Sequence, residues 1–385
     1  MNRKLRMGMI GGGKGAFIGA VHRMAAMLDG ECELVCGAFS STPERSKESG
    51  RAFYLPDDRV YGDYGEMIEK EKALPFDKRM DFVSIVTPNN MHFPAAKLAL
   101  ENGFPVMSDK PMTYSLDEAK KLARIVEKTG LLFGLTHNYT GYPMVKEARD
   151  MVLSGKLGKI RKIVVEYPQG WLAGRLEDTG QKQASWRTDP KRAGIANCMG
   201  DIGIHAENLS EYITGLSITE VCADLTKFVE GRLLDDDGNV LLHFSNGAKG
   251  VLHASQISVG EENSLNIRVY GAKGGLEWHQ MEPNTLIAKW NDRPAEIMRT
   301  GGGYLGERSH MNTRLPMGHP EAFVEAFANL YRNFIATLKS IIDGVEPKPE
   351  YLDFPSVKEG ISGMTFIETV VESSASERKW TPMKS

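Results

Sequence analysis

Short apolar runs alternate with helix-like stretches between residues 5 and 138, and this alternation constrains the fold more than any other feature. The runs are LRMGMI at 5–10, CELVCGAF at 32–39, RVYGD at 59–63, DFVSIVTP at 81–88, FPVMS at 104–108 and LLFGLTHN at 131–138. Apolar strands separated by helices are typical of a parallel sheet with helices on its faces. The first part of the chain is therefore predicted to be an α/β domain.

The rest of the chain has a different pattern. Helices are expected over 144–155 and 204–214, with a loop-rich stretch from 168 to 199 between them. Strand-like runs follow at 239–244, 249–258, 263–271, 276–280 and 285–290, and the Asn-Gly step between the first two indicates a hairpin. Amphipathic helices are expected at 320–343 and 357–373. This succession predicts an open, mainly antiparallel sheet. The acidic run at 234–239 is expected to be a solvated turn.

Length and charge narrow the classes of function. A chain of 385 residues favours two domains. Lys and Arg number 47 against 50 Asp and Glu, a net charge of -3, so neither nucleic acid nor an anionic membrane surface is an expected partner. No run approaches the roughly 20 apolar residues of a membrane span. The four cysteines form no CxxC pair, and we expect a reduced, cytoplasmic protein.

The stretch MIGGGKGAFIGAVHR follows the first predicted strand and opens a helix, which is the context of a dinucleotide-binding turn. Glycines allow the backbone to turn tightly and to approach a pyrophosphate at the helix N-terminus. Gly11 and Gly13 fit the first two positions of the fingerprint. Ala16 fits the third position directly, and Gly19 fits it after an insertion; we prefer Gly19.

The end of the second predicted strand bears on the choice of cofactor. An acidic residue there would hydrogen-bond the ribose 2′-hydroxyl of NAD, but AFSSTPERS contains no acid before Glu44. Ser40, Ser41 and Arg45 instead suit a 2′-phosphate. NADP(H) is therefore favoured, and NAD(H) stays possible. A helix cap with surface serines is the structural alternative.

Three further stretches carry candidate chemical groups. TPNNMH places Thr87, Pro88, Asn89 and His92 after one strand, and SDKP places Asp109 and Lys110 after the next. Ligands of open parallel sheets bind beyond the carboxyl ends of the strands, so both stretches are expected beside the glycine turn. GDIGIH places Asp201 and His205 four residues apart, on one face if the segment is helical. Such groups can move a proton while hydride moves at the adjacent carbon.

The glycine-rich first turn, TPNxxH, DKP and GDIGIH, in this order, resemble the glucose-fructose oxidoreductase / inositol dehydrogenase / rhizopine catabolism family, Gfo/Idh/MocA. The resemblance covers nearly the whole chain. It implies a Rossmann dinucleotide-binding domain over 1–140. A substrate-binding and oligomerisation α/β domain over 141–385 would follow, with an open-faced sheet and a homodimer or homotetramer as the assembly.

By that resemblance, Lys110 matches the catalytic lysine, Asp201 the substrate-orienting aspartate and His205 the catalytic histidine. Asp109 departs from the family, which usually has a glutamate before the lysine. The cofactor-binding set then comprises Gly11, Gly13, Gly19, Ser40, Ser41, Arg45, Thr87, Pro88, Asn89, His92, Asp109 and Lys110. The substrate-binding set comprises Lys110, Asn138, Tyr139, Trp186, Arg187, Asp201 and His205.

The predicted function is a nicotinamide-dependent oxidoreductase that interconverts a secondary alcohol and a ketone on a sugar, cyclic polyol or glycoside. A redox-cofactor-assisted glycoside hydrolase and a non-catalytic dinucleotide- and sugar-binding regulator are the alternatives. The histidines outside the named motifs show no converging ligand spacing, so no metal site is expected.

Overall fold

The computed structural model describes residues 3–384, which form two compact units. The first contains the chain up to Asn138 together with Phe323–Ile361, and the second contains Tyr139–Ala322 together with the chain from Ser362 onward. The division expected from the sequence, 1–140 and 141–385, differs from these units in where it assigns residues 139–140 and 323–361. The roles given to the two domains stay predictions.

A parallel sheet forms the first unit, as the alternating pattern predicts. Its strands are β1 (Leu5–Gly11), β2 (Cys32–Ala38), β3 (Phe82–Val86), β4 (Val106–Ser108) and β5 (Phe133–Leu135), in the order β2-β1-β3-β4-β5. The expectation of a strand at 59–63 is wrong. A 3-10 turn, Asp57–Arg59, is followed by a single bridge at Val60. The chain then enters the next helix, whose cap Asp63 accepts the Glu66 amide at 2.9 Å.

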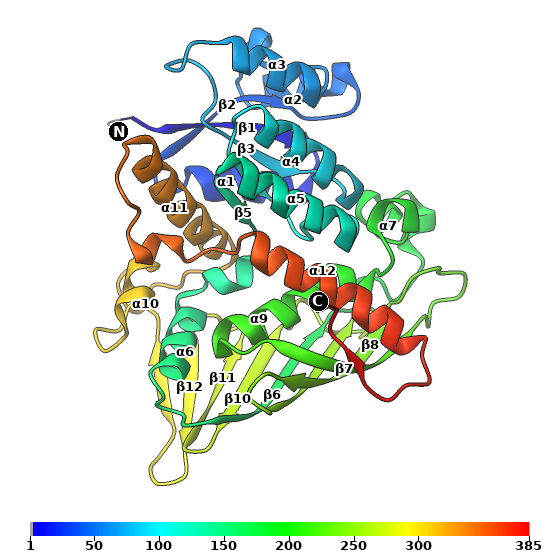
Figure 1. Cartoon of the computed structure of the whole chain (residues 1–385), viewed down its shortest axis with the longest axis vertical. Helices are drawn as coiled ribbons and strands as arrows, with labels where there is room; N and C mark the ends of the chain where they lie inside the picture. The colour runs from blue at the N-terminus through cyan, green and yellow to red at the C-terminus, as the bar shows by residue number, and fades with distance from the viewer. Residues whose placement is uncertain (1–2, 385) are drawn as a thin grey trace. The chain divides into compact units, whose positions relative to one another are not determined.

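Helices cover this sheet. They are α1 (Phe17–Met27), α2 (Pro43–Ala52), α3 (Tyr64–Ala73), α4 (His92–Glu101), α5 (Leu116–Thr129) and α11 (Phe323–Ile342) (Figure 1). The right-handed crossovers run outward in opposite directions from β1 and β3, which places α1 and α4 on opposite faces of the sheet.

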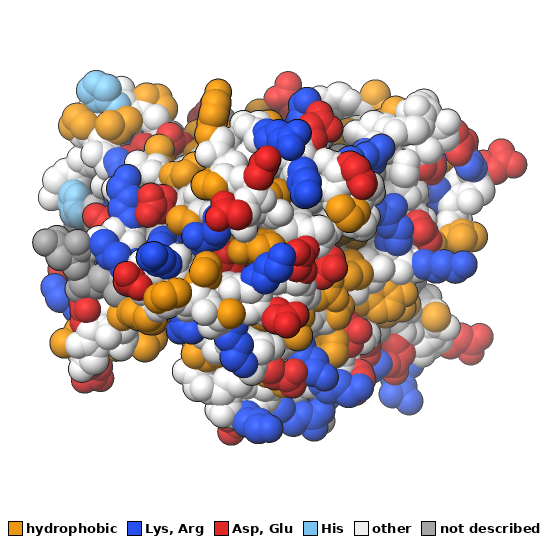
Figure 2. Space-filling model, turned by 90° about the horizontal axis from the view of Figure 1, so that it is seen from above, with side chains coloured by type: hydrophobic (Ala, Val, Ile, Leu, Met, Phe, Trp, Pro, Cys, Tyr) orange, Lys and Arg blue, Asp and Glu red, His pale blue; other side chains and the backbone are white. Residues whose placement is uncertain are grey.

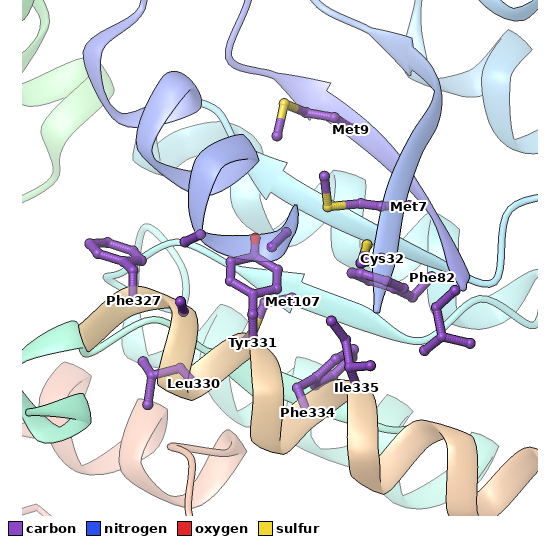
Figure 3. Packing of buried hydrophobic residues seen from close by; sticks show 14 of the residues in the cluster. Met7, Met9, Cys32, Phe82, Met107, Phe327, Leu330, Tyr331, Phe334 and Ile335 are labelled. Carbon is purple, nitrogen blue, oxygen red and sulfur yellow. The ribbon is translucent and has the colours of Figure 1, made fainter. Parts of the chain in front are cut away.

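Helix α11 completes the core of the first unit although it lies far along the sequence. Phe327, Tyr331 and Phe334 point from this helix toward the sheet, where Met7 and Met107 are buried (Figure 3). Burial of such side chains contributes about 1.5–3 kcal/mol each in transfer free energy. The amphipathic pattern at 320–343 predicts the helix and its apolar face, and the structure shows which sheet that face covers.

The second unit is built on a nine-stranded sheet, mainly antiparallel, as predicted. Its order is β13-β12-β11-β10-β6-β9-β8-β7-β14, with only β6 and β9 parallel. The strands are β6 (Ile160–Pro168), β7 (Ile218–Thr226), β8 (Asp237–Phe244), β9 (Lys249–Ser255), β10 (Asn266–Gly271), β11 (Gly274–His279), β12 (Thr285–Trp290), β13 (Glu296–Arg299) and β14 (Thr381–Pro382). The predicted hairpin is confirmed, because β8 pairs antiparallel with β9.

Helices α6 (Pro143–Leu153) and α9 (Ile204–Thr214) lie along one face of this sheet (Figure 1). A π-helical turn, Met199–Gly203, leads directly into α9. The loop-rich stretch before it contains a 3-10 turn (Leu176–Thr179) and the short helices α7 (Lys182–Arg187) and α8 (Pro190–Ala193). Helices α10 (Glu307–Met311) and α12 (Val357–Ser374) complete the helices of the described residues. The remaining 3-10 turns are Asn89–Met91, Asn138–Gly141 and Pro349–Leu352.

Charges of both signs are mixed on the surface. Figure 2 shows Lys and Arg side chains interspersed with Asp and Glu over the face that it draws. Within residues 3–384, none of the helices is both long enough and apolar enough to cross a lipid bilayer.

Candidate active site

The turn after β1 is shaped by glycines. Gly11 and Gly12 have φ angles of 81° and 65°, in the region that favours glycine. A Cβ on Gly13 would lie 2.7 Å from the carbonyl oxygen of Phe39, and one on Gly19 would lie 2.4 Å from Cα of Gly12. The backbone is therefore bare at the turn, and α1 packs directly against it. This arrangement fits the pyrophosphate of a dinucleotide.

Ala16 and Gly19, the two candidates for the third position of the fingerprint, have different surroundings in the structure. Ala16 is the N-cap of α1 and has an extended backbone, whereas Gly19 lies in the first turn of the helix at the close approach to Gly12. Arg23 donates to the Gly12 carbonyl oxygen at 2.6 Å and so holds the turn from the helix side. The close approach of Gly19 to Gly12 supports Gly19 as the third position of the fingerprint.

The loop after β2 carries the polar groups proposed for a 2′-phosphate. Ser40 is half-buried, and its Oγ accepts the Thr42 amide at 3.2 Å. Ser41 and Arg45 are exposed, and Glu44 stands in the first turn of α2. The three predicted residues thus lie together on one loop and the helix that follows it, with two of them open to a ligand.

His92 joins the loops that follow β3 and β4. Its Nδ1 lies 2.7 Å from the Pro111 carbonyl oxygen, and its Nε2 lies 2.9 Å from the Thr87 carbonyl oxygen. Burial lowers the pKa of His92 and outweighs the opposing effect of Asp109. Pro88 and Asn89 occupy the same turn after β3. His92 therefore fixes both loops, and its contact with a cofactor stays a prediction.

Asp109 and Lys110 directly follow β4. The Asp109 Oδ1 accepts the Lys110 amide at 2.8 Å and the Thr136 hydroxyl at 3.0 Å. Burial by itself would raise the pKa of the Asp109 carboxyl, but His22, Lys110 and His92 outweigh burial and hold that pKa below its usual range. Asp109 is therefore a carboxylate at neutral pH, and it fixes the backbone from which the half-buried Lys110 side chain projects.

His137 lies close enough to Lys110 to feel its charge, and the sequence motifs did not single it out. It follows β5 and is buried. Burial, reinforced by the positive charge of Lys110, lowers the pKa of His137 to about 3. Its position after a parallel strand is the same signal that singled out Lys110, so the sequence could have indicated it. Asn138, predicted to bind substrate, comes next and is also buried.

In the second unit, Asp201 lies in the π-helical turn before α9. Its Oδ2 accepts a hydrogen bond from Arg187 Nε at 3.0 Å and another from Gln256 Nε2 at 2.9 Å. Gln256 follows β9, and its Oε1 accepts from Asn197 Nδ2 at 3.0 Å. The structure thus brings together Asp201 and Arg187, which are two predicted site residues. It also places Gln256, which belongs to no sequence motif, against Asp201.

The acidic run at 234–239 supports this turn, so the expectation of a solvated turn is wrong. Asp235 is buried, and its carboxylate oxygens accept the Asn197 amide at 2.7 Å and the Met199 amide at 2.8 Å. Burial raises the pKa of Asp235 to about 6. Asp236 is also buried and pairs with Arg232 at 3.3 Å. Unpaired backbone amides explain why these acids turn inward.

His205 lies on α9 against a tyrosine cluster. Its ring centroid is 4.8 Å from that of Tyr139 at an interplanar angle of 88°. Tyr139 and Tyr167 share a short hydrogen bond, Tyr167 donates to Asn263 Oδ1 at 2.7 Å, and Asn263 Nδ2 donates to Tyr139 at 3.1 Å. Burial raises the pKa of Tyr139 to about 12, so its hydroxyl stays protonated at neutral pH. Tyr167 and Asn263 were not predicted.

Aromatic faces surround Arg187. Its guanidinium lies 4.3 Å from the ring centroid of Trp186 and 5.9 Å from that of Trp171. Its Nη1 donates to Gln183 Oε1 at 2.6 Å, and Trp171 Nε1 donates to Gln169 Oε1 at 3.0 Å. A planar cation, a carboxylate and aromatic rings are groups that can bind the hydroxyls and apolar faces of a sugar.

The second unit contains a cavity of about 820 Å³. Its lining includes Lys156, Lys273, Trp290 and Arg293, and none of its lining residues is a predicted site residue. Arg293 pairs with Glu296 at 3.2 Å, so part of the positive charge is already neutralised. Within residues 3–384, no three His, Cys, Asp or Glu side chains are grouped as a metal ion would require.

Two family models match the chain. One, described as the oxidoreductase family with an NAD-binding Rossmann fold, matches residues 5–137. The other, described as the GFO/IDH/MocA C-terminal domain, matches residues 145–277. The chain belongs to the Gfo/Idh/MocA family. The resemblance and the α/β fold class predicted from the sequence are thereby confirmed.

Relatives of this Gfo/Idh/MocA protein match it over nearly their whole length. The uncharacterized oxidoreductase YfiI of Bacillus subtilis is 32% identical, over 100% of this chain and 98% of YfiI. An oxidoreductase structure from Sinorhizobium meliloti is 42% identical, with a TM-score of 0.88, over 98% of this chain and 99% of that one.

An inositol dehydrogenase homolog from Azotobacter vinelandii has been solved in two complexes. The complex with NAD+ is 32% identical, with a TM-score of 0.93, over 99% of this chain and 98% of that one. The complex with NADH and myo-inositol is 30% identical, with a TM-score of 0.91, over the same shares of the two chains. The Rossmann unit of the present chain is accordingly an NAD-binding fold of an oxidoreductase.

Proposed function

We propose that this chain is a nicotinamide-dependent dehydrogenase or reductase that interconverts a secondary alcohol and a ketone on a sugar, cyclic polyol or glycoside. The observation that carries the proposal is the Asp201 carboxylate, held by Arg187 and Gln256 next to tryptophan faces. These groups suit a ligand with several hydroxyls. The relative solved with NADH and myo-inositol supports the same class of substrate.

The site residues have distinct roles in this reaction. A bound nicotinamide supplies the hydride acceptor or donor. Lys110 is the principal general acid/base and exchanges a proton with the reacting oxygen, His205 is its partner in proton transfer, and Asp201 orients a substrate hydroxyl. Trp186, Arg187, Asn138 and Tyr139 bind the substrate. Thr87, Pro88, Asn89, His92 and Asp109 contribute to cofactor binding.

NADP(H) is the preferred cofactor in this proposal. Ser40, Ser41 and Arg45 offer hydroxyls and a cation at the end of β2, and no acid precedes Glu44. A carboxylate at that point would repel a 2′-phosphate, and its absence favours the phosphorylated cofactor. NAD(H) is the alternative, since the Azotobacter vinelandii relative was solved with NAD+ and with NADH.

A panel of sugars, cyclic polyols and glycosides, assayed with both cofactors, tests the function. We expect reduced-nicotinamide absorbance to change with at least one polyol, in step with formation of the ketone. Release of free sugar without net reduction would instead identify a glycoside hydrolase. Tight binding of dinucleotide and sugar without turnover would identify a regulator. Either of these results would overturn the proposal.

We also propose a homodimer or homotetramer that forms through the open face of the nine-stranded sheet. Helices α6 and α9 cover one face, and exposed apolar side chains on the strands include Leu241, Tyr270 and Ile297. Size-exclusion chromatography with light scattering should give the mass of two or four chains. A monomer at micromolar concentration would contradict this assembly.

A further inference from the structure

Asp109 is contacted from the interior of the first unit by a histidine to which the proposed chemistry gives no role. We propose that His22, held in place by Tyr331, is a positioning residue that fixes Asp109 and, through it, the proposed general acid/base Lys110. This inference rests on the proposed function. It adds a residue of α1 and a residue of α11 to the support of the site.

His22 is part of a buried polar chain that crosses the first unit. Its side chain is fully buried, and its Nδ1 lies 2.8 Å from the hydroxyl oxygen of Tyr331. That hydroxyl lies 2.8 Å from Ser84 Oγ on β3. The Tyr331 hydroxyl points away from α11 toward the sheet and α1 (Figure 3). Three elements thus meet at one hydrogen-bonded group inside an otherwise apolar core.

The second ring nitrogen of His22 faces Asp109. Nε2 lies 3.9 Å from Asp109 Oδ1, which is longer than a hydrogen bond, and no described residue forms a hydrogen bond with this nitrogen. A buried polar atom without a partner is costly, about 1–3 kcal/mol. The carboxylate that it faces is therefore the group with which it can interact most favourably.

The polar chain also sets the direction of the hydrogen bonds. Burial raises the pKa of Tyr331, so its hydroxyl remains protonated and has one proton to donate. If Tyr331 donates to His22 Nδ1, the ring carries its proton on Nε2 and directs it toward the Asp109 carboxylate. With the opposite tautomer, a lone pair on Nε2 would face a negative charge in a buried space, which is unfavourable. The geometry therefore favours the Nε2–H tautomer.

Asp109 transmits this restraint to Lys110. The same oxygen that faces His22 accepts the Lys110 amide at 2.8 Å and the Thr136 hydroxyl at 3.0 Å. The Asp109 amide in turn donates to the Ile85 carbonyl oxygen at 2.9 Å. Two hydrogen-bond donors and the facing His22 ring nitrogen restrict the side-chain rotamer of Asp109, and the rotamer fixes the start of the Lys110 backbone. A general base displaced by about 1 Å can cost about 100-fold in rate.

Variants of His22 in the full-length chain test the proposal. His22→Leu removes both ring nitrogens, whereas His22→Gln places an amide N–H near the position of Nε2. We expect His22→Leu to lower kcat about 10- to 100-fold, with the dinucleotide Kd and the substrate KM changed less than threefold. His22→Gln should recover most of kcat, and Tyr331→Phe should fall between the two.

Val21→Ala is the matched control, because it weakens packing of α1 at the buried position next to His22 and removes no polar atom. It should lower stability and leave kcat unchanged. Equal kcat in His22→Leu and wild type would overturn the proposal. Equal losses in His22→Leu and His22→Gln would do the same, because they would reveal a purely structural role.

Nitrogen NMR of the histidine side chains, with His22→Gln to assign the His22 signal, tests the same point without turnover. Correlation spectra should report a proton on Nε2 of His22, and the Nδ1–H tautomer would overturn the proposal. If no polyol is turned over by the wild-type chain, the proposed function fails. The tautomer still decides whether His22 directs a proton toward Asp109.

Discussion

Arg187 donates a hydrogen bond to Asp201 across 3.0 Å and thereby ties the loop-rich stretch before α9 to the turn that carries the proposed substrate-orienting aspartate. The same carboxylate oxygen also accepts from Gln256. Because one oxygen receives both donors, the carboxylate has a defined orientation. Changes in the loop should therefore alter substrate recognition through Asp201.

Replacement of Arg187 tests this link. Arg187→Ala removes a charged hydrogen bond worth about 1.5–3 kcal/mol, so KM for the substrate should rise about 10-fold or more, while KM for the dinucleotide stays unchanged. Arg187→Lys should recover only part of the loss, because lysine lacks the planar guanidinium. The exposed neighbour Lys191→Ala is the control. Wild-type substrate kinetics in Arg187→Ala would disprove the link.

Arg45 should set the preference for a phosphorylated cofactor. Its side chain is exposed in the first turn of α2, where a 2′-phosphate would accept a charge-assisted hydrogen bond. Arg45→Ala should lower kcat/KM for NADPH about 10-fold and leave that for NADH nearly unchanged. Arg51→Ala, on the same helix and paired with Asp57, serves as control. A parallel loss with both cofactors would argue against a 2′-phosphate contact.

His137 should make the folded state sensitive to acid. Its pKa is about 3 in the folded chain against 6.5 ordinarily, so the unfolded chain takes up this proton first as pH falls. The stabilisation is complete above pH 6.5 and is lost between pH 6.5 and about 3.

The free energy of unfolding of His137→Asn should therefore fall less steeply in that window, by up to about 1.4 kcal/mol per pH unit. Denaturant titrations of wild type and variant at several pH values measure the difference. The exposed His319→Asn should leave the wild-type slope unchanged. Identical slopes in wild type and His137→Asn would refute the assignment.

Local patterns predicted most of the fold because each depends on neighbours in the sequence. The alternating runs predicted all five parallel strands, and the Asn-Gly step predicted the β8–β9 hairpin. The run at 59–63 misled because it contains the apolar Val60 and Tyr61, yet Asp63 caps a helix and ends the extended segment. That α11 covers the first sheet depends on long-range packing, which periodicity does not encode.

The site residues also differ in how far the sequence could predict them. Glycine spacing indicated Gly19, because the close approach of α1 to the turn leaves no room for a side chain there. The strand pattern placed Lys110 after β4, and its catalytic role stays a prediction. Gln256, Asn263 and His22 belong to no motif, and only tertiary contacts bring them to Asp201, Tyr139 and Asp109. The burial of Asp235 and Asp236 could not be predicted from their charge, because charge alone does not reveal which backbone amides need acceptors.

The turnover of Lys110→Ala tests whether Lys110 is the general acid/base of the reaction. With a polyol substrate identified for the wild type, kcat should fall about 1,000-fold or more, because a positioned general acid/base contributes roughly 100- to 10,000-fold. The dinucleotide Kd should stay within about threefold, and the exposed Lys97→Ala should behave as wild type. Turnover of Lys110→Ala near the wild-type rate would show that Lys110 is not the general acid/base.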